Sequence, residues 1–364
     1  MIITISIIIL ILFNAIILIS LQKVFFSEHY KINEVKISDR EVGISIVIAA
    51  KNEEGNIKSL IKNLNSVNYS HDKYEVILVD DHSIDNTLNE INESIRGNEN
   101  FKVISLSEDG KKGKREALTK GISETKFENI LITDADCKPE QEWLNAYSEK
   151  FSKDFDFLFG IAPFRQANAA VNKLSCFENL RSSILTFSFA GLGLPYSAAA
   201  RNFGFTKQAF EILGGYSKTN QTISGDDDLL LREAVKKKMK IGTITEKGSH
   251  VYSKAEKLFK DYVSQKARHT QTSLHYLVIH KLFLGVWHLL NLLSLFSAMF
   301  MIYNPLWGII CASKLVIDFF VVKINEKKFG YKFNLFDIIF LQIIYELLLI
   351  LHFINARFMK IKWK

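Results

Sequence analysis

The sequence predicts an α/β fold, in which a doubly wound, mostly parallel sheet is flanked by helices and transmembrane helices lie at both ends. Apolar, β-branched runs alternate with segments whose apolar residues recur every three or four positions, which is the pattern of strands and helices in a parallel sheet. In addition, each end of the chain carries an apolar stretch long enough to cross a bilayer.

Four strands are predicted in the first half of the globular part, because each is a short apolar run bounded by polar residues. In chain order they are Ile44–Ala49, Tyr74–Val79, Phe101–Leu106 and Asn129–Thr133. Helices are predicted between them, where apolar residues share one helical face, at Ile57–Leu64, Leu88–Ile95 and Lys114–Ile122. A helix between successive strands is the usual connection in a parallel sheet.

Five polar residues stand at the carboxyl ends of these strands: Asn52, Asp80, Asp81, Asp134 and Asp136. Ligands of an open parallel sheet bind beyond those ends, so the topology predicts one shared site. A dinucleotide site is excluded, because the loop after the first strand reads AAKNEEG and lacks G-x-G-x-x-G. A P-loop is excluded as well, because the glycine spacing before the GKR tripeptide is wrong and Arg replaces the Ser or Thr.

Asp134 and Asp136 stand two residues apart after the strand Asn129–Thr133. Side chains at i and i+2 of an extended segment leave the same face, so both carboxylates can point into one cleft. Two carboxylates at close range repel each other, which predicts a bound cation, and hard oxygen ligands suit Mg²⁺ or Mn²⁺. The alternative is a strand that ends in an ordinary turn, where aspartate is common.

A second acidic motif, SGDDDLL, opens a predicted helix at Ser224–Leu230. The helix dipole favours aspartate in the first turn, but three in succession repel one another and exceed what capping requires. Asp226 and Asp227 are therefore candidate catalytic residues, since a carboxylate in the cleft can take a proton from an attacking hydroxyl.

The helix predicted from Ala255 onwards leads into Gln265–His269, which reads QKARH and precedes the C-terminal apolar region. Arg268 can fork onto a diphosphate. Basic residues that face the membrane surface next to the apolar region are an equally good explanation of this motif.

Ile2–Leu21 predicts an uncleaved membrane anchor, because it lacks the basic start and the cleavage site of a signal peptide. Basic residues follow this span and none precedes it, which predicts a cytoplasmic globular part. Further spans are predicted at Leu282–Ile302 and Leu306–Val322. Polar residues interrupt the apolar segment Phe336–Ile354. We predict that this segment crosses the membrane, although the crossing would place the basic C-terminal tail on the outer side, against the positive-inside rule. The alternative is a helix that lies at the membrane interface.

The predicted organisation is therefore an N-terminal anchor over residues 1–22, a linker over 23–42, a cytoplasmic catalytic domain over 43–270 and a membrane region over 271–364 with two or three transmembrane helices. This organisation predicts a multi-pass protein of the cell membrane, in contact with membrane lipids. The net charge of +7 fits attraction to an anionic membrane face, and the scattered lysines form no nucleic-acid signature. The three cysteines lie far apart, which excludes a disulfide framework and a zinc site.

Seven motifs in this order resemble the membrane-anchored glycosyltransferases of family 2, an inverting group with the GT-A fold that includes hyaluronan, chitin and cellulose synthases. The motifs are IAAKNEE, LVDDHSIDNT, GKREALTKG, DADCKP, FTKQAFEILGGY, GDDDLL and QKARH, and they extend from Ile48 to His269.

The resemblance implies a nucleotide-sugar donor, most often a UDP-sugar, and assigns roles by position. Asn52, Glu53, Asp80 and Asp81 would hold the uridine, Lys114 the diphosphate region, and Asp134 and Asp136 the nucleotide and the metal. Asp227, which follows Asp226 in the acidic motif, would be the general base, and Gln265 and Arg268 would close over the donor and the acceptor.

This sequence departs from the family pattern at Ala50 and, more importantly, at His269, where polymerising members carry a Trp on which the acceptor sugar stacks. Since imidazole stacks less well, we predict one or a few transfers to a lipid-linked or saccharide acceptor. Leu174–Tyr196 either presents such an acceptor at the interface or belongs to the core. Two alternatives stay open: a polyprenyl-phosphate sugar synthase, and a catalytically silent membrane scaffold with the same fold.

Overall fold

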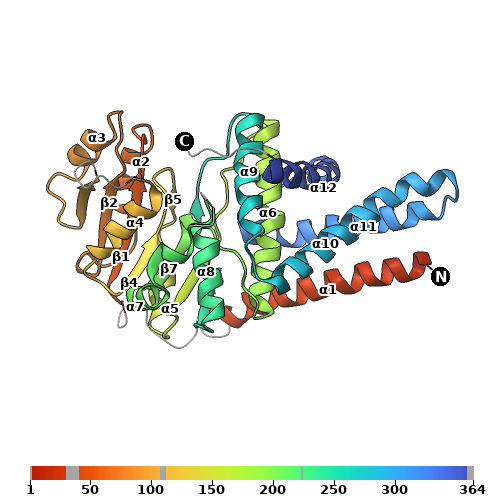
Figure 1. Cartoon of the computed structure of the whole chain (residues 1–364), viewed down its shortest axis with the longest axis horizontal. Helices are drawn as coiled ribbons and strands as arrows, with labels where there is room; N and C mark the ends of the chain where they lie inside the picture. The colour runs from red at the N-terminus through yellow and green to blue at the C-terminus, as the bar shows by residue number, and fades with distance from the viewer. Residues whose placement is uncertain (1, 30–40, 107–111, 223, 359–364) are drawn as a thin grey trace.

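The computed structural model describes residues 2–29, 41–106, 112–222 and 224–358 (Figure 1). Its centre is a seven-stranded sheet in the order β3-β2-β1-β4-β7-β6-β8. The strands are β1 (Ile44–Ala50), β2 (Tyr74–Asp80), β3 (Phe101–Ser105), β4 (Asn129–Ile132), β6 (Phe157–Gly160), β7 (Phe203–Thr206) and β8 (Ile241–Ile244). A two-stranded ribbon joins β5 (Lys138–Pro139) to β9 (Val251–Tyr252).

The four strands predicted from the sequence are confirmed, and they pair in parallel. The remaining sheet strands β6, β7 and β8, of four residues each, were not predicted from the sequence. β7 runs antiparallel to both β4 and β6, which makes the sheet mostly rather than wholly parallel.

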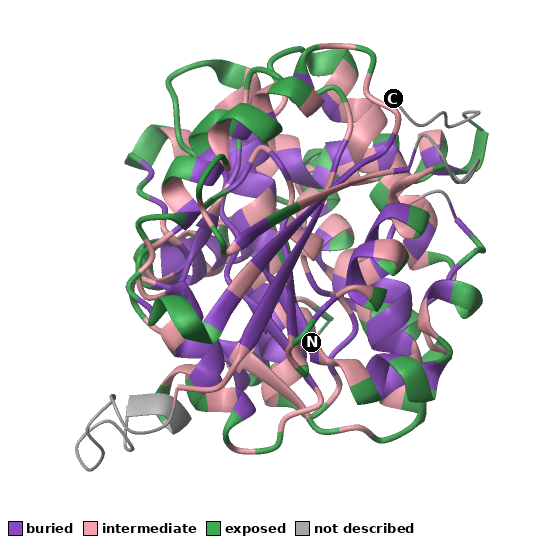
Figure 2. Cartoon of the chain, turned by 90° about the vertical axis from the view of Figure 1, so that its left-hand side faces the viewer, coloured by how far each residue is buried: buried purple, intermediate pink, exposed green. Residues whose placement is uncertain are grey.

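Helices cover both faces of the sheet, so its strands are buried, as Figure 2 shows in purple. Alternate residues of β1 serve the two cores: Ile46 and Ile48 pack with α2 (Ile57–Leu64) and α5 (Trp143–Phe151), whereas Val47 packs with α4 (Lys114–Ser123). The other helices of the globular part are α3 (Thr87–Ser94), α6 (Ala170–Gly191), α7 (Lys207–Leu213), α8 (Asp226–Lys236) and α9 (Phe259–Ser273). The segment Leu174–Tyr196 falls largely in α6, much of which is core; α9 begins four residues later than predicted.

Helix α4 lies close to the sheet at Gly121, and this contact gives a stability prediction. A Cβ atom at this position would lie 2.4 Å from Val47 Cγ1, whereas nothing lies within 4 Å of a Cβ at Gly55. We expect Gly121→Ala to lower the free energy of unfolding by about 1–3 kcal/mol, the usual cost of overpacking. Thermal unfolding in detergent measures the change, with Gly55→Ala as the near-neutral control; equal stability of the two variants would contradict the close packing.

Three of the described helices contain stretches that are long and apolar enough to cross a membrane: Ile2–Phe26, Val278–Ile302 and Leu335–Phe358. They belong to α1 (Ile2–His29), to α10 (Val278–Phe296) with the short helix η5 (Ser297–Ile302) that continues it, and to α12 (Leu335–Phe358). The predicted span Leu306–Val322 is helical, as α11 (Trp307–Asn325), but it is not among the three and carries charged residues such as Lys314 and Asp318.

Helices α1, α10 and α11 lie side by side and project together from the globular part (Figure 1). Helix α1 continues past its predicted end at Leu21, because Val24 and Phe25 still pack against the protein core. The predicted linker over 23–42 is thus helical up to His29, and residues 30–40 lie outside the described part of the chain.

Candidate active site

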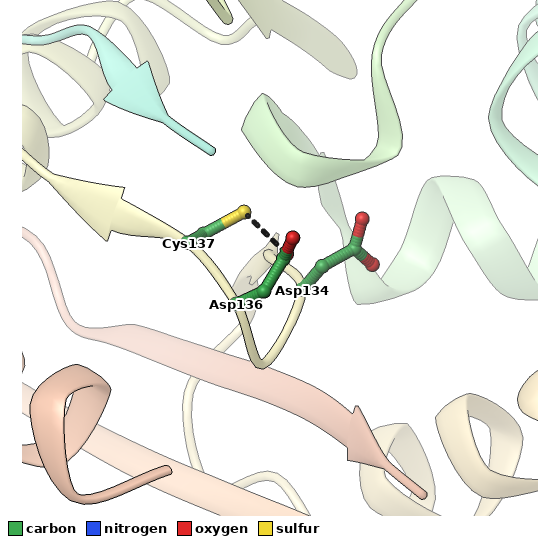
Figure 3. Close-up of side chains that lie close together, drawn as sticks. All are labelled: Asp134, Asp136 and Cys137. Carbon is green, nitrogen blue, oxygen red and sulfur yellow. Dashed lines mark hydrogen bonds between the residues drawn. The ribbon is translucent and has the colours of Figure 1, made fainter. Parts of the chain in front are cut away.

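The loop after β4 presents two carboxylates on the same side. Figure 3 shows Asp134 and Asp136 next to each other, with the sulfur of Cys137 directed toward Asp136. Potential ligand atoms of these three residues all lie within 4.8 Å of one another. Burial and the nearby charge of Asp134 raise the pKa of Asp136 above its usual value, which is the mutual repulsion that the i, i+2 spacing predicts.

Lys114, the first residue of α4, forms an ion pair with Asp134, with its Nζ 2.6 Å from Oδ1. Burial alone would raise the pKa of Asp134, but the ammonium group of Lys114 lowers it overall. Burial also acts to lower the pKa of Lys114, yet the carboxylates of Asp134, Asp226 and Asp227 outweigh it and raise that pKa. Lys114 is therefore close to the acidic residues of both motifs.

The end of β2 contributes Asp80 and Asp81, whose side chains are buried. Asp81 accepts a hydrogen bond of 3.0 Å from the Gly113 N–H, next to Lys114. Asp80 accepts one from the Ser83 N–H, and its Oδ1 has no hydrogen-bond partner among the described residues. A buried acceptor of this kind is available to a ligand donor.

The loop after β1 is organised by its own polar residues. Asn52 has a positive φ of 55°, and its side-chain oxygen accepts a hydrogen bond from the Ile84 N–H. Glu53 accepts one from the Asn56 amide, and its own N–H donates to Thr87 Oγ1. These bonds join the loop after β1 to the loop after β2, so the residues assigned to the nucleotide lie in neighbouring loops.

The three aspartates of the second motif form the first turn of α8 and have different partners. Asp226 Oδ1 lies 2.8 Å from Arg115 Nε, an ion pair that ties α8 to α4. Asp228 accepts hydrogen bonds from Ser197, from the Ala198 N–H and from the Tyr276 hydroxyl. These contacts tie Asp226 to α4 and Asp228 to the segment before β7 and to Tyr276, and the predicted catalytic role of Asp226 stays a prediction.

Asp227 accepts a hydrogen bond of 2.5 Å from the Ala200 N–H and has no ion pair among the described residues. Burial and the charges of Asp228 and Asp226 raise its pKa well above the ordinary aspartate range. A carboxylate with a raised pKa holds a proton more strongly, which is the property that a general base requires.

Helix α9 carries the QKARH motif along one side of this cluster. The surrounding protein and the charges of Lys266 and Arg268 disfavour the protonated form of His269 and lower the pKa of its imidazole. His269 is close enough to Asp134 to influence the pKa of that carboxyl group. Arg268 and Gln265 are both partly buried. Burial lowers the pKa of Arg268, and the charge of Glu256, which belongs to neither acidic motif, acts in the opposite direction.

Sequence reasoning missed Arg201, which follows from the strand pairing. Because β7 is antiparallel to β4, with Phe203 opposite Ile132, the residues before β7 lie beside those after β4. The Thr133 hydroxyl donates to the Arg201 carbonyl, and the charge of Arg201 acts on both Asp134 and Asp136. Its guanidinium donates to the Ala162 carbonyl and lies over the ring of Phe164. No local motif marks this arginine.

The residues at the end of β4 fit a hard divalent cation. Asp134 and Asp136 provide adjacent carboxylate oxygens, the donors that Mg²⁺ and Mn²⁺ prefer. Cys137 is not a suitable third ligand, because burial raises the pKa of its thiol well above the usual value and keeps it protonated.

Two cavities lie elsewhere on the molecule. One of about 500 Å³ is next to the end of α1, and one of about 720 Å³ is beside β5 and β9. Neither is lined by Asp134, Asp136 or Asp227, so the charged cluster, and not cavity volume, identifies the site.

Residues 45–211 match a family model described as glycosyl transferase family 2. A probable glycosyltransferase of Bacillus subtilis, YdaM, is 28% identical over 194 residues, which are 52% of this chain and 46% of that protein. A beta-monoglucosyldiacylglycerol synthase of Nostoc is 30% identical over 194 residues, which are 52% of this chain and 40% of that protein. The chain thus matches less than half the length of either relative.

Among solved structures, a mannosyltransferase of Pyrobaculum calidifontis in complex with GDP-mannose and Mn²⁺ superposes with a TM-score of 0.56. The superposition covers 97% of this chain and 99% of that protein at 17% identity. At this identity the likeness concerns the fold.

Proposed function

Because residues 45–211 match the model of glycosyl transferase family 2 and the relatives described above are glycosyltransferases, we propose that this chain is a membrane-bound, inverting glycosyltransferase of that family, which moves a sugar from a nucleotide-sugar donor to a lipid-linked acceptor. Its fold is of the GT-A type, with a mostly parallel sheet between helices. The observation that carries the proposal is the position of Lys114, which is paired with Asp134 and lies near Asp226 and Asp227. Two acidic motifs about 90 residues apart in sequence thereby meet at one site.

In the proposed reaction, Asp227 takes the proton of an acceptor hydroxyl, whose oxygen forms a bond to the anomeric carbon of the donor sugar. The bond from that carbon to the diphosphate breaks on the opposite face, and the nucleoside diphosphate leaves with the electron pair. Lys114 and Arg268 offer positive charge to the leaving group. A divalent cation held by Asp134 and Asp136 would supply further positive charge there. The nucleotide is oriented by four residues of the loops after β1 and β2, with UDP as the favoured nucleotide. They are Asn52, Glu53, Asp80 and Asp81.

A lipid-borne acceptor is favoured by three features. Three described helices are long and apolar enough to cross a membrane, which would hold the globular part beside a bilayer. His269, at the end of the QKARH motif, is a poorer stacking platform for a growing saccharide than the Trp of polymerising relatives. In addition, the Nostoc relative is named as a synthase of a glycosylated diacylglycerol.

The raised pKa of Asp227 predicts the pH dependence of transfer. The base is active only when deprotonated, so activity falls as the pH decreases through the raised pKa, by up to about tenfold per pH unit. We expect the ascending limb of kcat/KM to lie well above pH 4, the ordinary range of an aspartate. Rates measured from pH 4 to 9 at saturating metal test this, and a flat profile between pH 4 and 7 would contradict the assignment.

The function itself is tested with the purified full-length protein in lipid vesicles, supplied with a panel of UDP- and GDP-sugars and with diacylglycerol or polyprenyl phosphate. We expect release of nucleoside diphosphate from at least one donor, dependent on a lipid acceptor and stopped by a chelator of divalent metals. Transfer that persists unchanged in the chelator would remove the metal from the proposal. If no donor bound or reacted under any of these conditions, the silent-scaffold alternative would replace it.

A further inference from the structure

We propose that α12 does not cross the membrane but lies in the plane of the bilayer, with its outer apolar face in the hydrocarbon of the leaflet next to the globular part. By length and composition alone, α12 is equally able to span. Its contacts along the chain decide between the two arrangements. This inference concerns membrane topology and does not depend on sugar transfer.

The helix is held to the globular part at both ends. Near its start, Asp337 accepts hydrogen bonds of 3.0 Å from Lys173 Nζ. Fifteen residues later, which is about 22 Å along a helix, His352 lies 3.2 Å from the Tyr262 hydroxyl and 3.5 Å from Glu178. A helix that crossed the bilayer would carry one of these ends away from the globular part.

Lys173 and Glu178, which contact the two ends of α12, both belong to α6, a helix that lies across the membrane helices. Along α6, Lys173 contacts α12, Arg181 contacts Asp318 of α11 at 3.1 Å, and Ser188 donates to the Ile17 carbonyl of α1. One helix thus touches three others in turn. Figure 1 agrees, because α6 and α9 run across the direction of α1, α10 and α11, and α12 is seen nearly end-on beside α6 and α9.

The middle of α12 is also tied to the protein. Glu346 pairs with Lys314 of α11 at 3.1 Å, and the same ammonium pairs with Asp318 at 2.8 Å. Just before α12 begins, the Phe333 carbonyl accepts a hydrogen bond from Lys323, also of α11. Together with the contacts of Asp337 and His352, these bonds hold α12 against other helices of the protein near its start, at its middle and near its end.

The two sides of α12 differ as this arrangement requires. The polar residues between its ends face the protein and are almost fully buried, namely Gln342, Glu346 and His352. The opposite side is exposed and apolar from end to end, with Phe336, Phe340, Leu347, Ile350, Leu351, Ile354 and Phe358. An exposed surface of this size in a folded protein is expected to be covered, and lipid hydrocarbon matches its chemistry.

An in-plane α12 also removes the conflict with the charge rule that a crossing creates. Arg357 at the end of α12 then stays on the side of the globular part, as the positive-inside rule favours. Helices α1 and α10 then remain as the described helices apolar enough to span, and α11 lies beside both of them.

Cysteine labelling of the full-length protein in sealed membrane vesicles tests the topology. Single substitutions are made at three exposed positions: Arg357→Cys at the end of α12, Glu93→Cys in the globular part and Tyr303→Cys at the tip between α10 and α11. The unsubstituted protein, with its own cysteines, gives the background. With a membrane-impermeant maleimide, we expect Arg357→Cys and Glu93→Cys to be labelled in inside-out vesicles and Tyr303→Cys in vesicles of the opposite orientation. Labelling of Arg357→Cys together with Tyr303→Cys would overturn the proposal.

A depth measurement provides an independent test on the apolar face. Spin labels attached at Phe336→Cys, Leu347→Cys and Ile354→Cys report their depth through collision with oxygen and with a water-soluble nickel chelate. An in-plane helix gives similar, shallow depths at all three positions. If the label at Leu347 were deepest, with the other two near opposite surfaces, α12 would cross the bilayer and the inference would be wrong.

Discussion

Replacing Asp227 with Asn is expected to lower the rate of sugar transfer by about 10²- to 10⁴-fold, the usual contribution of a general base. The amide has nearly the same shape as the carboxylate, and its side-chain oxygen can still accept the hydrogen bond from the Ala200 N–H. It cannot take up the proton of an acceptor hydroxyl at neutral pH. The donor contacts are elsewhere, so the affinity for the nucleotide sugar is expected to change little.

The measurement is single-turnover transfer from a radiolabelled nucleotide sugar, combined with donor binding by calorimetry. Asp226→Asn serves as the comparison, because it removes the ion pair with Arg115 but leaves Asp227 in place. We expect that variant to lose thermal stability and to keep more activity than Asp227→Asn. In Asp227→Asn, kcat/KM should also lose the rise with pH that is predicted for the unsubstituted protein.

The acceptor decides what a contrary result would mean. A phosphate oxygen needs no strong base, so full activity of Asp227→Asn with polyprenyl phosphate would favour the polyprenyl-phosphate sugar synthase. Full activity with a hydroxyl acceptor would show that Asp227 is not the base, and attention would move to the other carboxylates of the site.

The first half of the sheet was predictable from sequence because its signals are local. Ile44–Ala50 is apolar at nearly every position, as a strand buried on both faces must be, and the loops that follow β1, β2 and β4 hold the expected polar residues. The i, i+2 spacing likewise predicted the neighbouring carboxylates of Asp134 and Asp136. In each case the evidence lies within a few consecutive residues.

The rest of the site depends on contacts between distant segments, which no local pattern records. Arg115 meets Asp226 across 111 positions of the sequence, and Arg201 approaches Asp134 only because β7 pairs with β4 in an antiparallel register. The sequence DDD likewise does not indicate that Asp226, Asp227 and Asp228 contact different residues. The proposal that Asp227 acts as the base therefore rests both on these contacts and on the position that the family resemblance indicates.

Removing the second carboxylate of the metal-binding pair is the other substitution with a large expected effect. Asp134 has Lys114 as a counter-charge, whereas Asp136 forms no ion pair with any described residue and has a raised pKa from burial and from Asp134. A divalent cation is the partner that would relieve this repulsion. Asp136→Asn leaves one carboxylate, already neutralised by lysine, so the electrostatic attraction for a cation is largely lost.

We expect Asp136→Asn to weaken Mn²⁺ binding by at least about tenfold, since even outer-shell changes at metal sites cost 10- to 100-fold. The loss of free Mn²⁺ signal in electron paramagnetic resonance measures this without catalysis, and transfer activity should shift to correspondingly higher metal concentrations. Cys137→Ala is the matched control, because the buried, protonated thiol beside Asp136 is a poor ligand for a hard cation. Metal binding that survives in Asp136→Asn but fails in Cys137→Ala would reverse the assignment and place the thiol, not the carboxylate, at the metal.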